Sequence, residues 1–128
     1  MPSGNKYKLE DKNWIDLHDE QIVEIESGGR MKILFTPGHA DDHVCILLDN
    51  EVLFSGDNIL GGSTAVFDNY FSYMKSLDRM KNAIAKVGNA IIYPGHGDII
   101  EDGLDRIEYY IAHRLEREKQ ILQNLGNL

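Results

Sequence analysis

Three turns in the sequence present side chains that can bind a metal ion. In each turn a Pro-Gly or Ser-Gly pair directly precedes the candidate ligand, and these ligands are His39, Asp57 and His96. Histidine nitrogen and carboxylate oxygen are common zinc ligands, and a carboxylate can serve two ions in a hydrolytic site. One such histidine alone would be explained more simply as a turn residue bonded to backbone. The threefold repetition indicates a metal site.

Each of these turns follows an apolar run that predicts a strand, at 31–35, 52–54 and 90–93. Loops at strand ends are a usual place for functional residues. Further strands are predicted at 21–26 and 43–48, so that hairpins join 21–26 to the run at 31–36 and 43–48 to 51–55. We therefore expect the three candidate ligands to converge.

Two stretches have the period of amphipathic helices. The first covers 69–87, with Asp68 as the expected N-cap, and the second covers about 103–124, with Asp102 as the expected N-cap. The apolar side of the second helix is predicted to include Leu115, Leu122 and Leu125. Residues 1–19 read as a polar N-terminal segment.

Composition restricts the class of protein. A chain of 128 residues is at most one domain, and no apolar run approaches the ~20 residues that span a bilayer. The net charge of −8 argues against phosphate binding by bulk electrostatics. The single cysteine, Cys45, excludes an internal disulfide and fits a reducing compartment. The polar start of the chain resembles no targeting segment.

A rival metal motif would use His39 and His43, which are spaced i, i+4 as on a metalloprotease helix. That motif requires Glu directly after the first histidine, and Ala40 occupies the place. We therefore expect His43 to order the turn as a second-shell residue.

At these residues the chain resembles a family. Thr36-Pro37-Gly38-His39 with Asp41-Asp42-His43, then Phe54-Ser55-Gly56-Asp57, then Tyr93-Pro94-Gly95-His96-Gly97 resemble the third, fourth and fifth motifs of the metallo-β-lactamase superfamily. The segments at 66–67, 73–74, 76–77 and 111–118 resemble its β-lactamase-like protein 2 branch. The resemblance implies an αββα sandwich and zinc, with His39 on one ion, His96 on the other and Asp57 bridging both. It also implies cleavage of single-stranded RNA by a dinuclear zinc-activated hydroxide in the mitochondrial matrix.

The superfamily's second motif, His-x-His-x-Asp-His, which supplies four of the seven ligands, is absent from the chain. Residues 20–128 therefore correspond to the C-terminal half of the domain. The expected fold is mixed α/β (α+β): half a sandwich, with a mostly antiparallel sheet and two long helices on one face. Three ligands drawn from two metal positions leave each ion under-coordinated, so we expect a weak or empty zinc site and lost activity in the chain alone.

Three functions remain open. The first is an endoribonuclease, with His113, Arg114 and Arg117 as phosphate contacts, although these side chains fit a solvated charged face equally well. The second is a glyoxalase II-like thioester hydrolase. The third is an inactive half-domain that works only by binding, because its uncovered sheet face should associate with the missing N-terminal half or with a second copy. We expect no membrane partner, and a cytoplasmic location if the mitochondrial one fails.

Overall fold

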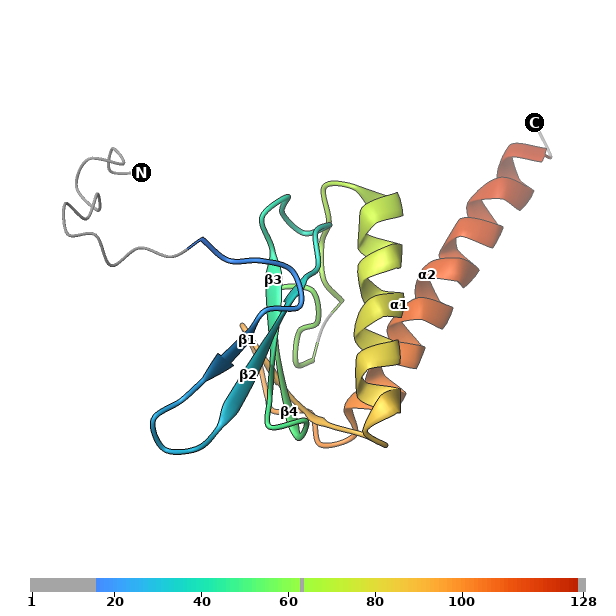
Figure 1. Ribbon diagram of the computed structural model, residues 1–128. Coiled ribbons are helices and arrows are strands. Elements are labelled where there is room, and N and C mark those ends of the chain that lie inside the picture. Colours follow the sequence, from blue (N-terminus) through green and yellow to red (C-terminus); the bar gives the residue numbers. More distant parts are fainter. Residues whose placement is uncertain (1–15, 63, 127–128) are drawn as a thin grey trace.

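The computed structural model describes residues 16–62 and 64–126. Figure 1 shows one layer of strands beside one layer of helices. Most of the predicted polar segment 1–19 lies outside the described residues, and the part that is described, 16–19, forms no helix or strand. Neither of the two helices in this part of the chain has the length and apolar character needed to cross a membrane.

Five strands form one sheet in the order β1-β2-β3-β4-β5. The strands are β1 (Ile22–Glu24), β2 (Arg30–Phe35), β3 (Val44–Leu48), β4 (Val52–Gly56) and β5 (Ile91–Pro94). Neighbours from β1 to β4 pair antiparallel. β5 pairs parallel with β4, because the connection between them crosses back through a helix. The predicted mostly antiparallel sheet is confirmed.

The turn between β3 and β4 fixes the register of this hairpin. Asp49 and Asn50 both have positive φ, 52° and 58°, and the Glu51 amide donates to the Leu48 carbonyl at 3.0 Å. Two consecutive residues with positive φ match the right-handed twist of the flanking strands, and Asn and Asp tolerate this conformation. Leu48 lies opposite Val52, so the loop contains Glu51 in addition to Asp49 and Asn50.

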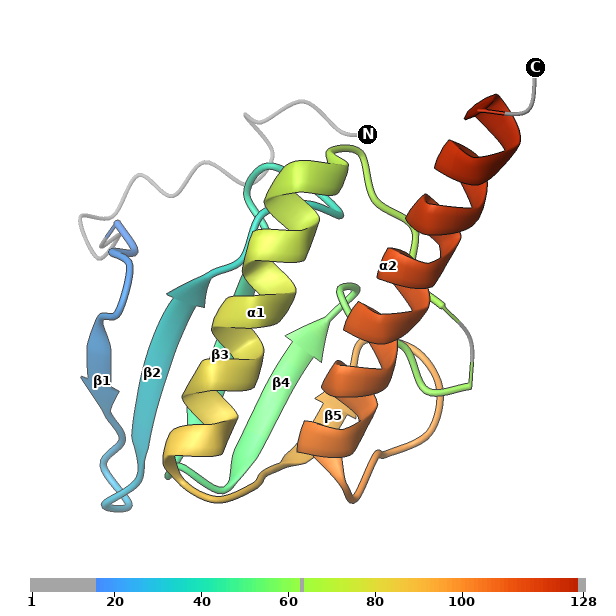
Figure 2. The ribbon, with the colours of Figure 1, turned by 90° about the vertical axis from the view of Figure 1, so that its right-hand side faces the viewer.

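Both helices, α1 (Tyr70–Lys86) and α2 (Gly103–Gly126), cover the same face of the sheet, as Figure 2 shows. The expected N-cap of α2 is confirmed, since Asp102 Oδ1 accepts from the Asp105 amide at 3.1 Å. The expected N-cap of α1, Asp68, is wrong by one residue. Asn69 caps α1 through Ser72, while the Asp68 amide donates to the carbonyl of Gly38.

The hydrophobic core lies between the sheet and the two helices. It is formed by the inward side chains of the strands and the facing side chains of the helices: Leu34, Cys45, Leu47, Leu53 and Ile92 with Tyr73, Leu77, Met80, Ile84, Ile107 and Tyr110. Side chains alternate between the two faces of a strand, so the residues between these inward positions point to the other side. The core accounts for the apolar period of α1 and for the first half of α2.

The opposite face of the sheet is also apolar. The outward residues of β2 to β5 form cross-strand rows and are Met31, Ile33, Phe35, Val44, Ile46, Leu48, Val52, Phe54, Ile91 and Tyr93. No described helix covers this face, and Figure 1 shows both helices on one side of the sheet. The sheet is therefore apolar on both faces, as expected for a strand layer that is covered on both sides.

The C-terminal half of α2 leaves the core. Figures 1 and 2 both show α2 leaning away from α1 toward its end. Leu115, Leu122 and Leu125, which were predicted on the apolar side of this helix, are 50%, 61% and 59% exposed. This part of the apolar stripe therefore lies outside the core, although Leu122 lines a pocket together with Phe67 and Tyr70.

Candidate metal centre

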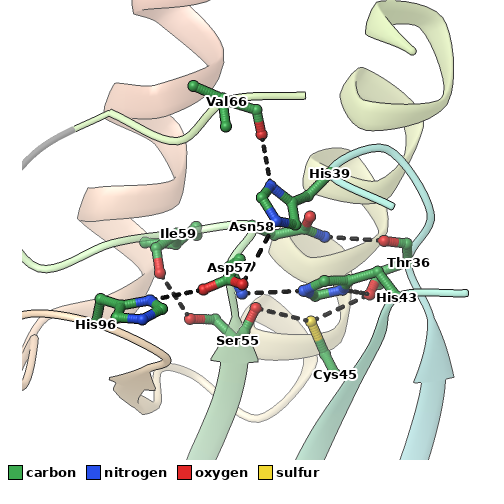
Figure 3. Close-up of polar contacts among 10 residues, drawn as sticks. All are labelled: Thr36, His39, His43, Cys45, Ser55, Asp57, Asn58, Ile59, Val66 and His96. Carbon is green, nitrogen blue, oxygen red and sulfur yellow. Dashed lines mark hydrogen bonds and ion pairs between the residues drawn. The ribbon is translucent and has the colours of Figure 1, made fainter. Parts of the chain in front are cut away.

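Three strands that run in the same direction bring the predicted ligands to one edge of the sheet. β2 and β4 are both antiparallel to β3, and β5 is parallel to β4. The C-terminal ends of β2, β4 and β5 therefore point the same way, and each is followed by its ligand-bearing turn. Figure 3 shows the resulting cluster of His39, Asp57 and His96.

Asp57 lies between the two histidines. Its Oδ1 is 2.9 Å from His96 Nδ1, and its Oδ2 is 3.4 Å from His39 Nε2. The His96 side chain is 78% exposed, whereas those of His39 and Asp57 are about one-third exposed. Because a carboxylate only accepts hydrogen bonds, His96 Nδ1 donates to it. The two imidazoles thus approach different oxygens of one carboxylate.

A backbone carbonyl from a distant loop orients His39. Its Nδ1 lies 2.9 Å from the carbonyl oxygen of Val66, and a carbonyl only accepts, so Nδ1 carries a proton. In the neutral ring Nε2 then presents a lone pair toward Asp57 Oδ2. The lone pairs of His39 Nε2 and Asp57 Oδ2 repel each other unless a cation or a proton lies between them. This support of the second ring nitrogen is common for metal-binding histidines.

His43 holds the backbone of Asp57. Its Nε2 accepts from the Asp57 amide at 3.0 Å, so its Nδ1 carries the proton and donates to Thr36 Oγ1, also at 3.0 Å. Burial lowers the pKa of His43, and the neighbouring His39 lowers it further. Both nitrogens of the neutral ring are thereby engaged. The structure places His43 beside the ligands, with both ring nitrogens bound to protein groups.

A directional chain of hydrogen bonds continues behind His43. Thr36 Oγ1 donates to Cys45 Sγ at 3.2 Å, and that thiol donates to the Ser55 carbonyl at 3.7 Å. Burial raises the pKa of Cys45 to about 12, although the Thr36 hydroxyl acts in the opposite sense. The thiol therefore stays protonated and acts as a donor. The residue type alone does not indicate its place in this chain of hydrogen bonds.

Glycine at position 56 makes the approach of His43 possible. Gly56 has a φ of +56°, and a Cβ built on it would lie 2.6 Å from His43 Nε2. Any larger residue would displace the imidazole from the Asp57 amide. Glycine at position 56 therefore allows both the positive φ of the turn and the close approach of the His43 ring.

The donor set fits zinc chemically but is incomplete. Two imidazoles and one carboxylate converge. The contact with the Val66 carbonyl keeps the proton of His39 on Nδ1, which leaves Nε2 as the nitrogen that can bind a metal. Yet within residues 16–62 and 64–126 no three His, Cys, Asp or Glu side chains are arranged to hold an ion by themselves. The cluster is therefore a candidate for one side of a metal centre, and a complete centre would need further ligands.

The predicted substrate contacts on α2 lie apart from this cluster. Arg114 donates to the Ala65 carbonyl, and its guanidinium lies 4.8 Å from the centroid of the Phe67 ring. His113 stacks on Tyr109 with ring centroids 5.9 Å apart, and Arg117 makes a 3.5 Å bond to Gln120. The structure thus uses Arg114 to fix the loop that supports His39, and none of these contacts reaches Asp57.

Two residues that support the site, Val66 and Asn58, could not be recognised from the spacing of residues in the sequence. Val66 lies 27 residues from His39, and its carbonyl contact is a backbone interaction that side-chain type does not encode. Asn58 donates from Nδ2 to the Thr36 carbonyl at 3.0 Å, while its buried Oδ1 has no partner among the described atoms. Asn58 directly follows the Ser-Gly-Asp motif and Val66 lies in the segment 66–67 that resembles the branch, but neither observation indicates these contacts.

Comparison with known proteins places this site in a family. The family model described as the metallo-β-lactamase superfamily matches residues 3–96. A β-lactamase-like protein 2 homolog from Drosophila melanogaster is 49% identical over 106 residues, which are 83% of this chain and 34% of that protein. An atrochrysone carboxyl ACP thioesterase from Aspergillus fumigatus is 36% identical over 111 residues, 86% of this chain and 34% of that protein.

Solved structures agree with this relationship. A metallo-β-lactamase family protein from Thermus thermophilus superposes with a TM-score of 0.71 at 31% identity, over 89% of this chain and 39% of that one. The chain thus spans about a third of the length of the curated relatives it matches. The predicted half-sandwich fold and the resemblance to the β-lactamase-like protein 2 branch are confirmed. The chain belongs to the metallo-β-lactamase superfamily.

Proposed function

We propose that this chain forms one side of a zinc-dependent hydrolase centre, and that the complete protein cleaves single-stranded RNA. The observation that carries the hydrolase proposal is the position of the Asp57 carboxylate between His39 and His96. His39, Asp57 and His96 would hold the metal together with ligands that this chain does not contain. When bound, zinc supplies Lewis-acid activation of water at neutral pH.

The chain's own residues would prepare this site by orientation. The Val66 carbonyl keeps the proton of His39 on Nδ1, and the His43 ring fixes the Asp57 backbone. His96 Nδ1 donates to Asp57 Oδ1, which orients that carboxylate. The Thr36 hydroxyl and the Cys45 thiol keep His43 in one tautomer. These contacts reduce the reorganisation needed to complete the centre.

The RNA substrate is supported by similarity to the β-lactamase-like protein 2 branch, at 49% identity to the Drosophila relative. The net charge of −8 opposes RNA binding by bulk electrostatics, so the metal ions would have to neutralise the scissile phosphate. We also propose the mitochondrial matrix as the compartment of the complete protein. Fractionation of cells that produce the complete protein would test this location.

A chimaera tests the RNA proposal directly. This chain would replace the matching third of the Drosophila relative, and labelled single-stranded RNA would be incubated with the purified chimaera. We expect zinc-dependent cleavage that a chelator stops and that Asp57→Ala or His39→Ala abolishes, while His18→Ala keeps it. Cleavage that persists in both ligand variants would refute the metal mechanism.

A thioester substrate is the second candidate. An acidic chain is better suited to a substrate other than a polyanion, and one relative at 36% identity bears the name of an ACP thioesterase. The same chimaera would be assayed on a lactoyl thioester and on a longer acyl thioester. Thioester hydrolysis without RNA cleavage would replace the first candidate by the second.

Self-association is a candidate of another class, in which the chain acts only by binding. The continuous apolar outer face of β2 to β5 carries this proposal. In the complete protein the N-terminal half would cover the face, and in the isolated chain we propose that a second copy does so. Light scattering should show a dimer that Ile46→Lys weakens and that Leu125→Lys leaves intact. A monodisperse monomer at high concentration would contradict this candidate.

A further inference from the structure

An apolar cavity lies beside the loop that supports His39. It has a volume of about 350 Å³ and lies between Phe67 and Tyr70 on one side and α2 on the other, where its lining residues are Arg114, Arg117, Glu118, Ile121 and Leu122. Figure 2 shows that the first turn of α1 and the C-terminal half of α2 lie at the same end of the molecule. The cavity occupies this junction.

Contacts behind the lining hold the walls of the cavity in place. The Phe67 ring stacks on Tyr73 with centroids 5.2 Å apart and planes 17° apart, and Arg114 covers Phe67 from the side of α2. The Tyr70 hydroxyl donates to Glu118 at 2.9 Å and joins α1 to α2. The cavity is therefore formed before any ligand binds, which lowers the entropic cost of binding.

The position of the cavity links it to the candidate metal centre. Phe67 directly follows Val66, whose carbonyl binds His39 Nδ1 at 2.9 Å, and the Val66 side chain itself is 72% exposed. A ligand that fills the cavity thus lies against the segment that orients a metal ligand. His39 Nε2 in turn lies 3.4 Å from Asp57 Oδ2, so contacts of Val66 and His39 connect the cavity wall to the carboxylate.

The lining selects the chemistry of the ligand. Aromatic and aliphatic side chains dominate, and three charged residues, Arg114, Arg117 and Glu118, complete the lining. The Ala65 carbonyl accepts from Arg114 and the Tyr70 hydroxyl donates to Glu118, whereas Arg117 hydrogen-bonds only to the neutral Gln120 among the described residues. Small-molecule sites typically have this size and combine apolar walls with a few polar groups. An arginine beside an apolar wall suits a carboxylate at the end of an acyl chain.

We infer that this cavity binds the acyl part of an anionic substrate, with the chain against Ile121 and Leu122 and a carboxylate near Arg117. This inference rests on the second candidate of the proposed function, the thioester hydrolase, and favours that candidate over RNA cleavage. RNA has no such apolar segment. The cavity is thus an acyl-binding subsite at the side of the metal centre.

The test measures binding without catalysis. The full chain would be titrated with octanoate and with uncharged 1-octanol in the presence of a chelator, while the amide resonances of Val66 and Phe67 are followed by NMR. Ile121→Glu should weaken octanoate binding about tenfold, because it places a charge in the apolar wall. Leu125→Glu is the matched control, since Leu125 is equally exposed on α2 but does not line the cavity.

The charge of Arg117 is tested in the same way. Arg117→Gln should weaken octanoate about threefold and leave 1-octanol unchanged, while Lys119→Gln, on the neighbouring surface, should affect neither ligand. Equal loss in Ile121→Glu and Leu125→Glu, or no response at Val66 and Phe67, would overturn the inference. Displacement of octanoate by a short single-stranded RNA would also overturn it. Because metal is absent, none of these outcomes decides whether the complete protein hydrolyses substrates with zinc.

Discussion

His43 Nε2 accepts a hydrogen bond from the main-chain amide of Asp57 at 3.0 Å. This contact joins the turn after β2 to the turn after β4, so the carboxylate is positioned by its backbone as well as by its neighbours. A histidine that resembles a second metal ligand in the sequence thus holds the residue on which the other two converge.

Replacement of His43 should destabilise the domain. His43→Ala leaves the part-buried Asp57 amide without its acceptor, and we expect a loss of about 1–3 kcal/mol in the free energy of unfolding. Urea denaturation followed by circular dichroism would measure it. His18→Ala, at an exposed position, is the control and should change stability little. Equal stability of the two variants would show that the contact contributes nothing.

The thiol of Cys45 should resist alkylation in the folded protein. It is fully buried, and burial raises its pKa to about 12, so neither access nor ionisation favours reaction. Mass spectrometry after treatment with iodoacetamide at mildly alkaline pH should detect unmodified protein. The same treatment in concentrated urea should modify Cys45 completely. Rapid labelling under native conditions would mean that the hydrogen-bond chain behind His43 opens readily.

Gly38 should tolerate no side chain. A Cβ at this position would lie 2.5 Å from the Tyr73 Cα, so Gly38→Ala forces the His39 turn away from α1. We expect destabilisation of at least about 2 kcal/mol. Gly28→Ala is the matched comparison, because Gly28 also has a positive φ, +98°, but has open space around it. Its cost should be limited to about 1 kcal/mol of backbone strain. Thermal unfolding of both variants distinguishes clash from strain.

Stability should fall in acid through Asp19. Burial acts to raise the pKa of its carboxyl, but hydrogen bonds from the Phe35 amide and Arg79 outweigh burial and lower the pKa. The folded state then binds fewer protons than the unfolded state, so this stabilisation is present above about pH 4 and is lost as the pH falls through the lowered pKa. Urea unfolding between about pH 5 and pH 3 should show a smaller loss in Asp19→Asn than in the wild type. Equal losses of stability in Asp19→Asn and the wild type would show that Asp19 does not contribute to the sensitivity to acid.

Local signals in the sequence were sufficient to predict the helices and strands and the convergence of three side chains. The Pro-Gly and Ser-Gly pairs mark where β2, β4 and β5 end, and shared strand direction then brings His39, Asp57 and His96 together. The N-cap of α1 was misplaced because Asp68 and Asn69 are adjacent residues of the capping type. The amides of both residues donate to the carbonyl of Gly38, thirty residues before Asp68, and only the Asn69 side chain accepts from the Ser72 amide.

What the sequence left undetermined depends on partners in space. The carbonyl of Val66 supports His39, and Arg114 fixes the same loop instead of facing a phosphate. Neither role follows from residue type. The exposed leucines of α2 show the same limit, because periodicity identifies an apolar stripe but not the surface that it meets.

Because both faces of the sheet are apolar, each strand residue either packs in the core or faces the outer side of the sheet. Positions such as Leu34 and Leu47 belong to the core under the helices, whereas their neighbours Phe35 and Ile46 face the other side of the sheet. Sensitivity to substitution should therefore alternate along β2 and β3 between loss of folding and loss of assembly. Substitutions at adjacent residues of one strand should therefore affect different properties: one changes the stability of the fold, and the next changes assembly with a covering partner.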